Sequence, residues 1–189
     1  MNFCSTRELL IGTPAACMIA IFSLLTLPPR LAIASSLLGC IMLLIMIVDA
    51  RQYIIPDLLS LPAIPAGLLA SGMIVDPTSV QLVSVDYVLG ALAGGASMWV
   101  VRAGYYFARG KEGLGLGDVK LAAAAGAWLG WQHLSAVLLL ASTLALSYVL
   151  LLALLSRSLP SATTKIPLGA FLAPSIWIAW AFKTYAGIA

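Results

Sequence analysis

The chain has 189 residues, of which 62% are hydrophobic and 9% are charged, and its formal net charge is +3. Soluble domains usually carry about 25% charged residues, so this composition excludes a water-soluble globular protein and predicts an all-α bundle in a lipid bilayer. The small positive charge is spread along the chain, which argues against a nucleic-acid-binding patch. The cysteines, Cys4, Cys17 and Cys40, show no CxxC spacing, and we expect neither a metal nor a cofactor.

Long apolar runs divide the chain into elements, and a membrane span needs about 20 such residues. The expected spans are 9–27, 31–49, 58–75, 85–107, 118–131, 134–156 and 166–186. The fifth is short, so about seven crossings are expected, or six if 118–131 is re-entrant. The whole chain, 1–189, is expected to form a single transmembrane domain. Residues 1–30 resemble a secretory signal, because Arg7 precedes the first apolar run. However, Pro14 interrupts that run, which favours a retained first helix.

The basic residues indicate the orientation of such a bundle. With seven crossings, one side receives Arg7, Arg51, Arg109, Lys111, Lys120, Arg157 and Lys165. The other side receives Arg30 and Lys183 together with Asp76 and Asp86. Because basic loops stay in the cytoplasm, the N-terminus is expected there and the C-terminus outside.

Two aspartates fall on the predicted cytoplasmic face and form the candidate site. Asp49 ends an unbroken apolar run, and Asp118 follows a glycine-rich stretch that contains Gly115 and Gly117. Neighbouring carboxylates share a proton, because two like charges a few ångströms apart do not both ionise cheaply. Such a pair predicts acid–base hydrolysis of a peptide bond without a metal or a covalent intermediate. The glycines would let the backbone approach a substrate strand.

Other polar residues near this face have simpler interpretations beside the functional ones. Asp57 follows Pro56 at the start of the third span, where a helix N-cap is expected, and a supporting role near the site is the alternative. Asp118 taken alone would also be a helix cap. Lys120 would either set the topology or meet an acidic group of the substrate.

Several motifs, taken together in their order, resemble those of the type IV prepilin peptidases. They are Asp49 with Ile55-Pro56-Asp57, Gly110-Lys111-Glu112-Gly113, Gly115-Leu116-Gly117-Asp118 with Val119-Lys120-Leu121, Gly126-Ala127-Trp128 with Trp131, and Ile166-Pro167-Leu168-Gly169-Ala170-Phe171-Leu172. The resemblance covers about residues 31–185, with 1–30 as an extra N-terminal helix. It implies that Asp49 and Asp118, and not Asp57, are catalytic.

The resemblance also implies the setting of the reaction. The family members are aspartic endopeptidases of the bacterial or archaeal cytoplasmic membrane. They cleave the leader from prepilin and pseudopilin precursors at the cytoplasmic face. This chain is similar to the short forms that serve Flp/Tad-type pili or archaeal flagellins. It lacks the cytoplasmic insert with paired CxxC motifs, so N-methyltransferase activity is not implied.

Two other functions remain open at this stage. A presenilin-like protease shares Gly-x-Gly-Asp but cuts within the membrane, which the expected position of both aspartates at the rim does not favour. A small transporter could use Asp49 and Asp118 as a proton or cation relay. Transporters often contain two related halves, and no internal repeat is evident in this sequence.

Overall fold

The computed structural model describes residues 6–74, 80–156 and 166–188, and all regular secondary structure in these ranges is helical. Its elements are α1 (Thr6–Thr26), α2 (Pro29–Gln52), α3 (Asp57–Ile74), α4 (Val80–Arg109), α5 (Leu116–Leu129), the 3-10 helix η1 (Trp131–His133), α6 (Leu134–Ser156) and α7 (Leu168–Ile188). The predicted all-α fold is confirmed. Each predicted apolar segment corresponds to one α-helix, although 118–131 extends into η1 and residue 75 lies outside the described residues. The largest difference in bounds is the start of α4, at Val80 instead of residue 85.

The helices form a membrane bundle whose outer surface is rich in large apolar side chains. Within the described residues, Pro29–Gln52 and Trp131–Leu155 are long and apolar enough to cross a membrane, and Gly12–Thr26 and Asp57–Ser71 are shorter apolar stretches. Helix α5 has 14 residues, or about 21 Å at 1.5 Å per residue, which is less than the hydrocarbon thickness of about 30 Å. Among the described α-helices, α5 is also the shortest.

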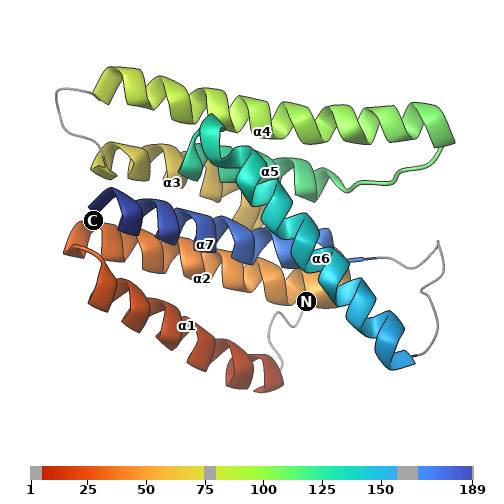
Figure 1. Ribbon diagram of the computed structural model, residues 1–189, viewed down its shortest axis with the longest axis horizontal. Coiled ribbons are helices and arrows are strands. Elements are labelled where there is room, and N and C mark those ends of the chain that lie inside the picture. Colours follow the sequence, from red (N-terminus) through yellow and green to blue (C-terminus); the bar gives the residue numbers. More distant parts are fainter. Residues whose placement is uncertain (1–5, 75–79, 157–165, 189) are drawn as a thin grey trace.

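The helices run alternately up and down the bundle (Figure 1). In that view α4 and α1 lie on opposite outer sides, with α3, α5, α7 and α2 between them, and α6 crosses obliquely beside α7. One end of the bundle contains the C-terminal ends of α2 and α4 and the N-terminal ends of α3, α5 and α7. We call it the site end. The loop 110–115 joins α4 to α5 there, on the right of Figure 1.

Glycines bring α4 and α5 into close contact. A Cβ at Gly90 would lie 2.5 Å from the carbonyl oxygen of Gly126, and a Cβ at Gly126 would overlap the same backbone oxygen of Gly90. A Cβ at Gly94 would overlap the carbonyl oxygen of Ala122. Small residues at such an interface let two helix backbones approach closely, which is how helices associate in lipid. Helix α5 is thereby held against α4 along its length.

Two tryptophans anchor α5 on its other sides. The rings of Trp128 and Trp180 are fully buried and meet edge to face, with centroids 5.8 Å apart. The indole N–H of Trp128 donates a 2.8 Å hydrogen bond to the carbonyl oxygen of Ala63 in α3. A Cβ at Gly67 would lie 2.6 Å from the Trp128 ring. Helix α5 therefore sits at the centre of the bundle, in contact with α3, α4 and α7.

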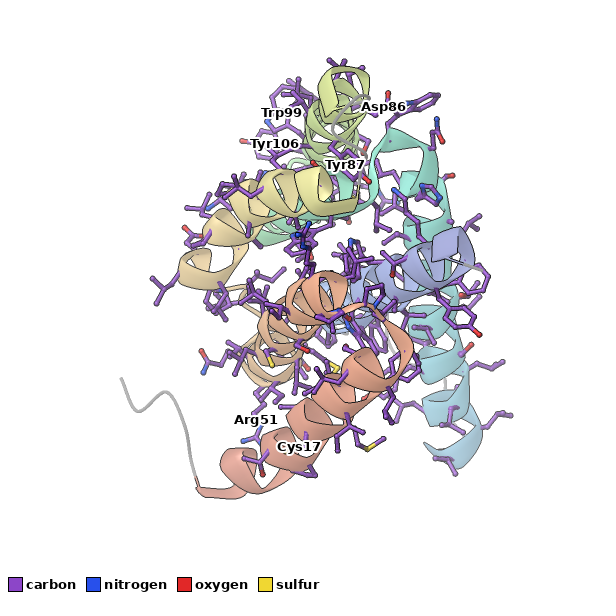
Figure 2. All side chains as sticks on the ribbon, turned by 90° about the vertical axis from the view of Figure 1, so that its left-hand side faces the viewer. Cys17, Arg51, Asp86, Tyr87, Trp99 and Tyr106 are labelled. Atoms are coloured by element: carbon purple, nitrogen blue, oxygen red, sulfur yellow. The ribbon has the colours of Figure 1, made fainter. Side chains whose placement is uncertain are left out.

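At the end opposite the site end, Lys183 ties α7 to α5 and α4. Its ammonium donates hydrogen bonds to the carbonyl oxygen of Leu129 (2.7 Å) and to the Tyr87 hydroxyl (3.1 Å). The Leu129 carbonyl belongs to the last turn of α5, where a cation is favourable. Figure 2 shows Asp86 and Tyr87 near the start of α4. Among the residues used to predict the topology, Asp76, Arg157 and Lys165 lie outside the described residues.

The two described cysteines form no disulfide. Cys17 is exposed on α1 (Figure 2) and Cys40 is half-buried in α2, and both are free thiols. Cys4 lies outside the described residues.

Candidate active site

Asp49 lies in the last turn of α2, and its carboxylate reaches the first turn of α7. It is 4% exposed. Its Oδ2 accepts a 2.8 Å hydrogen bond from the backbone N–H of Ala170, and the backbone of Gly169 also hydrogen-bonds to this carboxylate. Free N–H groups and the helix dipole make a helix N-terminus a favourable place for a carboxylate. A second helix thus holds Asp49, in addition to the helix that carries it.

Asp118 is the third residue of α5 and is half-buried. The N-cap residue is Gly115, which has extended backbone angles and provides no side chain for capping. The Asp118 carboxylate reaches back to the backbone of Gly115 and accepts a hydrogen bond there. An acidic side chain at this position of a first turn satisfies an otherwise unpaired N–H group. Asp118 therefore stabilises the start of α5 without being its N-cap residue.

The structure brings these two aspartates together at the site end. The negative charge of Asp49 is the side-chain charge that acts on the Asp118 carboxylate. Asp49 accepts hydrogen bonds from the backbone of Gly169 and Ala170 in the first turn of α7, and Asp118 accepts one from the backbone of Gly115, the N-cap residue of α5. The predicted co-location on one face is therefore found in the fold. Two adjacent carboxylates that share one proton are able to deliver an acid and a base to the same bond.

The short connection between α2 and α3 lies beside both aspartates. Tyr53 adopts a left-handed conformation (φ 54°, ψ 33°), and its N–H donates a 2.9 Å hydrogen bond to the Asp49 carbonyl oxygen, which ends α2. Ile55 follows and is 7% exposed. Its side chain contacts Gly117 of α5 and Gly169 of α7. In the sequence, Ile55 is recognisable only as part of the Ile55-Pro56-Asp57 motif, because an isoleucine near a helix end carries no signal of its contacts.

Asp57 and Lys120 form an ion pair that joins the starts of α3 and α5. The Lys120 Nζ lies 2.6 Å from Asp57 Oδ1, and the two side chains are 28% and 61% exposed. Asp57 is the first residue of α3, and the carbonyl oxygen of Pro56 accepts hydrogen bonds from the N–H groups of Leu59 and Ser60. These contacts place Asp57 within the first turn of α3 and pair it with Lys120, and its supporting role near the site stays a prediction. Lys120 already has an acidic partner within the protein.

The glycine-rich loop before Asp118 is fixed to α4 by Arg102. The guanidinium donates a hydrogen bond to the Leu114 carbonyl oxygen (2.8 Å) and one to Glu112 Oε1 (2.7 Å). The ring of Tyr105 lies against Gly113. Gly110 has a positive φ of 65°, which glycine adopts readily and which turns the chain away from α4. The only sequence signal for Arg102 was an arginine within an apolar segment.

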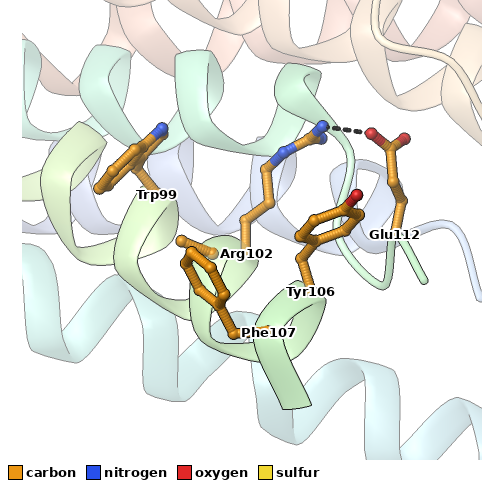
Figure 3. Close-up of a pocket in the computed structure, with 6 residues that line it drawn as sticks. Trp99, Arg102, Tyr106, Phe107 and Glu112 are labelled. Atoms are coloured by element: carbon orange, nitrogen blue, oxygen red, sulfur yellow. Dashed lines mark hydrogen bonds and ion pairs between the residues drawn. The ribbon is translucent and has the colours of Figure 1, made fainter. Parts of the chain in front are cut away.

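Arg102 and Glu112 also line a cavity of about 240 Å³ on the outer side of α4, together with Trp99, Ala103, Tyr106 and Phe107. Figure 3 shows the guanidinium directed at the Glu112 carboxylate, with the aromatic rings beside them. Trp99, Tyr106 and Phe107 are largely exposed. Within the described residues, no group of three or more His, Cys, Asp or Glu side chains is arranged to hold a metal ion.

Known proteins are similar in sequence to this chain over most of its length. The sequence model of the type IV leader peptidase family matches residues 36–150. The chain is 37% identical to the prepilin leader peptidase/N-methyltransferase of Escherichia coli (strain K12), over 87% of this chain and 68% of that protein. It is 34% identical to the protein of the same name from Aeromonas salmonicida (strain A449), over 93% of this chain and 58% of the relative.

A third relative of that name, from Pseudomonas putida, is 40% identical over 77% of this chain and 49% of its own length. The chain thus spans between about half and two thirds of the length of these relatives. No solved structure matches the chain significantly. Neither a transporter nor a presenilin-like protease is among the relatives described, and the family match includes both aspartates, the loop and α5. The chain therefore belongs to the type IV leader peptidase family.

Proposed function

We propose that this chain is an aspartic endopeptidase that removes the leader from type IV prepilin-like precursors, either Flp/Tad-type pilins or pseudopilins. Asp49 and Asp118 are its catalytic residues. The observation that carries the proposal is the position of two carboxylates from separate helices at the site end, where Ile55 packs against both Gly117, next to Asp118, and Gly169, next to the Asp49 carboxylate. The family membership supplies the reaction class, and the names of the relatives supply the substrate class.

The chemistry follows from one proton shared between two carboxylates. The ionised carboxylate takes a proton from a water molecule, and the resulting hydroxide attacks the carbonyl carbon of the peptide bond. The protonated carboxylate gives its proton to the carbonyl oxygen, which produces a neutral tetrahedral intermediate. The carboxyl that took the proton of water then gives it to the leaving nitrogen, while the other carboxylate takes a proton back from a hydroxyl of the intermediate. The C–N bond breaks, the new carboxyl group of the product forms, and the pair again holds one proton on the residue that held it at the start. Each substitution that removes one carboxylate removes either the acid or the base.

Residues beside the pair have supporting roles in this proposal. Gly115 is exposed and Gly117 directly precedes Asp118, so the start of α5 offers backbone to an extended substrate strand without a side chain in the way. Lys120 and Asp57 hold α5 and α3 in register through their ion pair. This ion pair forms within the protein and does not require the substrate.

The site end is proposed to face the cytoplasm, in the cytoplasmic membrane of a bacterium or archaeon. Support comes from the basic residues Arg51, Arg109, Lys111 and Lys120, which belong to the elements and loops of that end. The positive-inside rule then directs the N-terminus to the same side. The precursor's apolar helix would lie in the bilayer against the bundle while its leader reaches the aspartates.

A cleavage assay tests the proposed function. The detergent-solubilised protein is incubated with a purified prepilin, and the products are measured by intact mass spectrometry. The expected result is one cut that releases the leader at the boundary of the apolar helix. Cuts inside the apolar segment would instead indicate a presenilin-like protease. Ion-coupled solute flux into proteoliposomes without any proteolysis would indicate a transporter. Addition of S-adenosylmethionine is expected to leave the mass of the mature product unchanged, because the chain has no CxxC pair.

A further inference from the structure

Ile55 lies between the first turns of the two helices that hold the aspartates. Its Cβ is 2.7 Å from the position that a Cβ at Gly117 would take, and its Cγ1 and Cδ1 are 3.3 Å from it. Its Cδ1 is also 2.7 Å from the position of a Cβ at Gly169. Gly117 and Gly169 therefore leave just enough room for this one side chain, which is 7% exposed.

Each of these glycines is next to the machinery of one aspartate. Gly117 directly precedes Asp118 in α5. Gly169 directly precedes Ala170, whose N–H donates to Asp49 Oδ2, and a Cβ at Gly169 would be 2.9 Å from that same oxygen. Displacement of Ile55 would therefore change the positions of both carboxylates. Close-packed interiors respond to the loss of even a methylene group, so such a contact fixes positions well.

We propose that Ile55 is a positioning residue that sets the separation of Asp49 and Asp118 by holding apart the first turns of α5 and α7. This inference rests on the proposed function. Ile55 touches no reacting atom. It acts through Gly117 and Gly169, and the connection that carries it begins four residues after Asp49, at Tyr53, whose left-handed turn directs the chain back toward the site.

The expected size of the effect follows from the sensitivity of catalysis to geometry. A misplacement of a catalytic group by about 1 Å costs on the order of a hundredfold in rate. Ile55→Ala keeps the Cβ and deletes the atoms that reach Gly169, so the kcat for leader cleavage is expected to fall between about tenfold and a hundredfold. The KM is expected to change less than about twofold, because the substrate's binding surface is not altered.

A matched series of variants isolates the contact. Ile55→Val removes Cδ1 and keeps the β-branch, so it is expected to lose less activity than Ile55→Ala. Ile54→Ala is the control, since Ile54 is adjacent but 64% exposed, and its kcat is expected to remain at the wild-type level. In the Gly169→Ala background, Ile55→Val is expected to be less harmful than in the wild type, because it removes the Cδ1 that the new methyl group meets.

The pH profile of kcat separates positioning from a general loss of stability. Two coupled carboxylates titrate in two steps whose separation depends on their distance. Ile55→Ala is therefore expected to change the spacing between the acidic and alkaline limbs by about half a pH unit or more, whereas partial unfolding lowers the whole curve without moving its limbs. Asp57 and Lys120, the other charged pair nearby, remain the same in every variant.

Three outcomes decide the matter. If the wild type cleaves, Ile55→Ala loses kcat and its limbs move, the proposal stands. If the wild type cleaves but Ile55→Ala matches Ile54→Ala in kcat and limb positions, the positioning role is wrong while the peptidase function stands. If the wild type does not cleave a prepilin, the proposed function itself fails. A folded fraction measured by size-exclusion chromatography in detergent normalises every rate, and Ile55→Val supplies the comparison if Ile55→Ala does not fold.

Discussion

Gly169→Ala is the substitution that most sharply separates the positioning of Asp49 from the stability of the bundle. The new Cβ would lie 2.9 Å from Asp49 Oδ2 and 3.0 Å from its Cγ. Ordinary contact needs about 3.5 Å, so the carboxylate has to move by about 0.6 Å. The 2.8 Å hydrogen bond from the Ala170 N–H to Oδ2 is then lost or lengthened.

The magnitude follows from that hydrogen bond. A hydrogen bond to a charged group contributes about 1.5–3 kcal/mol, which corresponds to about tenfold to a hundredfold in rate. We expect kcat/KM for leader cleavage to fall by this factor. Alanine is favoured over glycine in a helix by about 1 kcal/mol, which offsets part of the steric cost to α7. We therefore expect a clear loss of kcat/KM together with only a small change in Tm.

The assay is cleavage of a purified prepilin, with rates normalised to the folded fraction of the detergent-solubilised protein. Gly187→Ala provides a matched control in the same helix, because a Cβ at Gly187 meets nothing within 4 Å. It should keep the wild-type rate. If Gly169→Ala also cleaves at the wild-type rate, the hydrogen bond from α7 does not position Asp49 for the reaction. If only its rate before normalisation falls, in proportion to its folded fraction, the contact is structural alone.

Three further substitutions test the surroundings of the site. Asp57→Asn breaks an exposed ion pair with Lys120 that is worth about 1 kcal/mol or less, so leader cleavage should fall less than about fivefold; complete loss would give Asp57 a part in the chemistry. Gly126→Ala forces α5 away from α4 and should destabilise the bundle by about 1–3 kcal/mol, seen as a lower Tm, whereas Gly104→Ala, with open space around it, should not. Trp128→Phe removes a buried hydrogen bond to α3 worth about 1 kcal/mol, and an unchanged Tm in detergent would contradict its role as an anchor.

The extents of the helices could be predicted because apolar runs in this chain are long and are separated by charged or glycine-rich breaks. Counting those runs also placed Asp49 and Asp118 at one end of the bundle. That prediction needed only the number of crossings between them. The short α5 with Asp118 in its first turn follows from the glycines before it and the Gly130 after it, both of which are local features of the sequence.

The contacts that complete the site could not be predicted, because they join residues far apart in the sequence. The N–H of Ala170 meets an aspartate 121 residues away, and Lys120 pairs with a residue 63 positions away. From the sequence, Asp49 is seen only near the end of its own helix. Which helix start packs against that end depends on how α2 and α7 lie side by side, and apolar composition does not encode this choice.

The loop before Asp118 illustrates the same limit. Its glycines predicted flexibility and access for a substrate strand. In the structure, Arg102 fixes the loop at both Glu112 and Leu114. An arginine within an apolar segment is costly without a partner, but nothing in the sequence identifies the loop as the partner of Arg102.

The joint action of Asp49 and Asp118 is tested most directly by comparing Asp49→Asn, Asp118→Asn and the double variant in the same cleavage assay. Asparagine keeps the shape of the side chain and an oxygen that accepts hydrogen bonds, so the fold should be retained. Residues that act as one unit lose almost all activity when either is replaced, and the second replacement adds little. We therefore expect both single variants to show no leader removal above background, with the double variant no lower. A single variant that cleaves at the wild-type rate, or two partial losses that multiply in the double variant, would contradict the shared-proton mechanism.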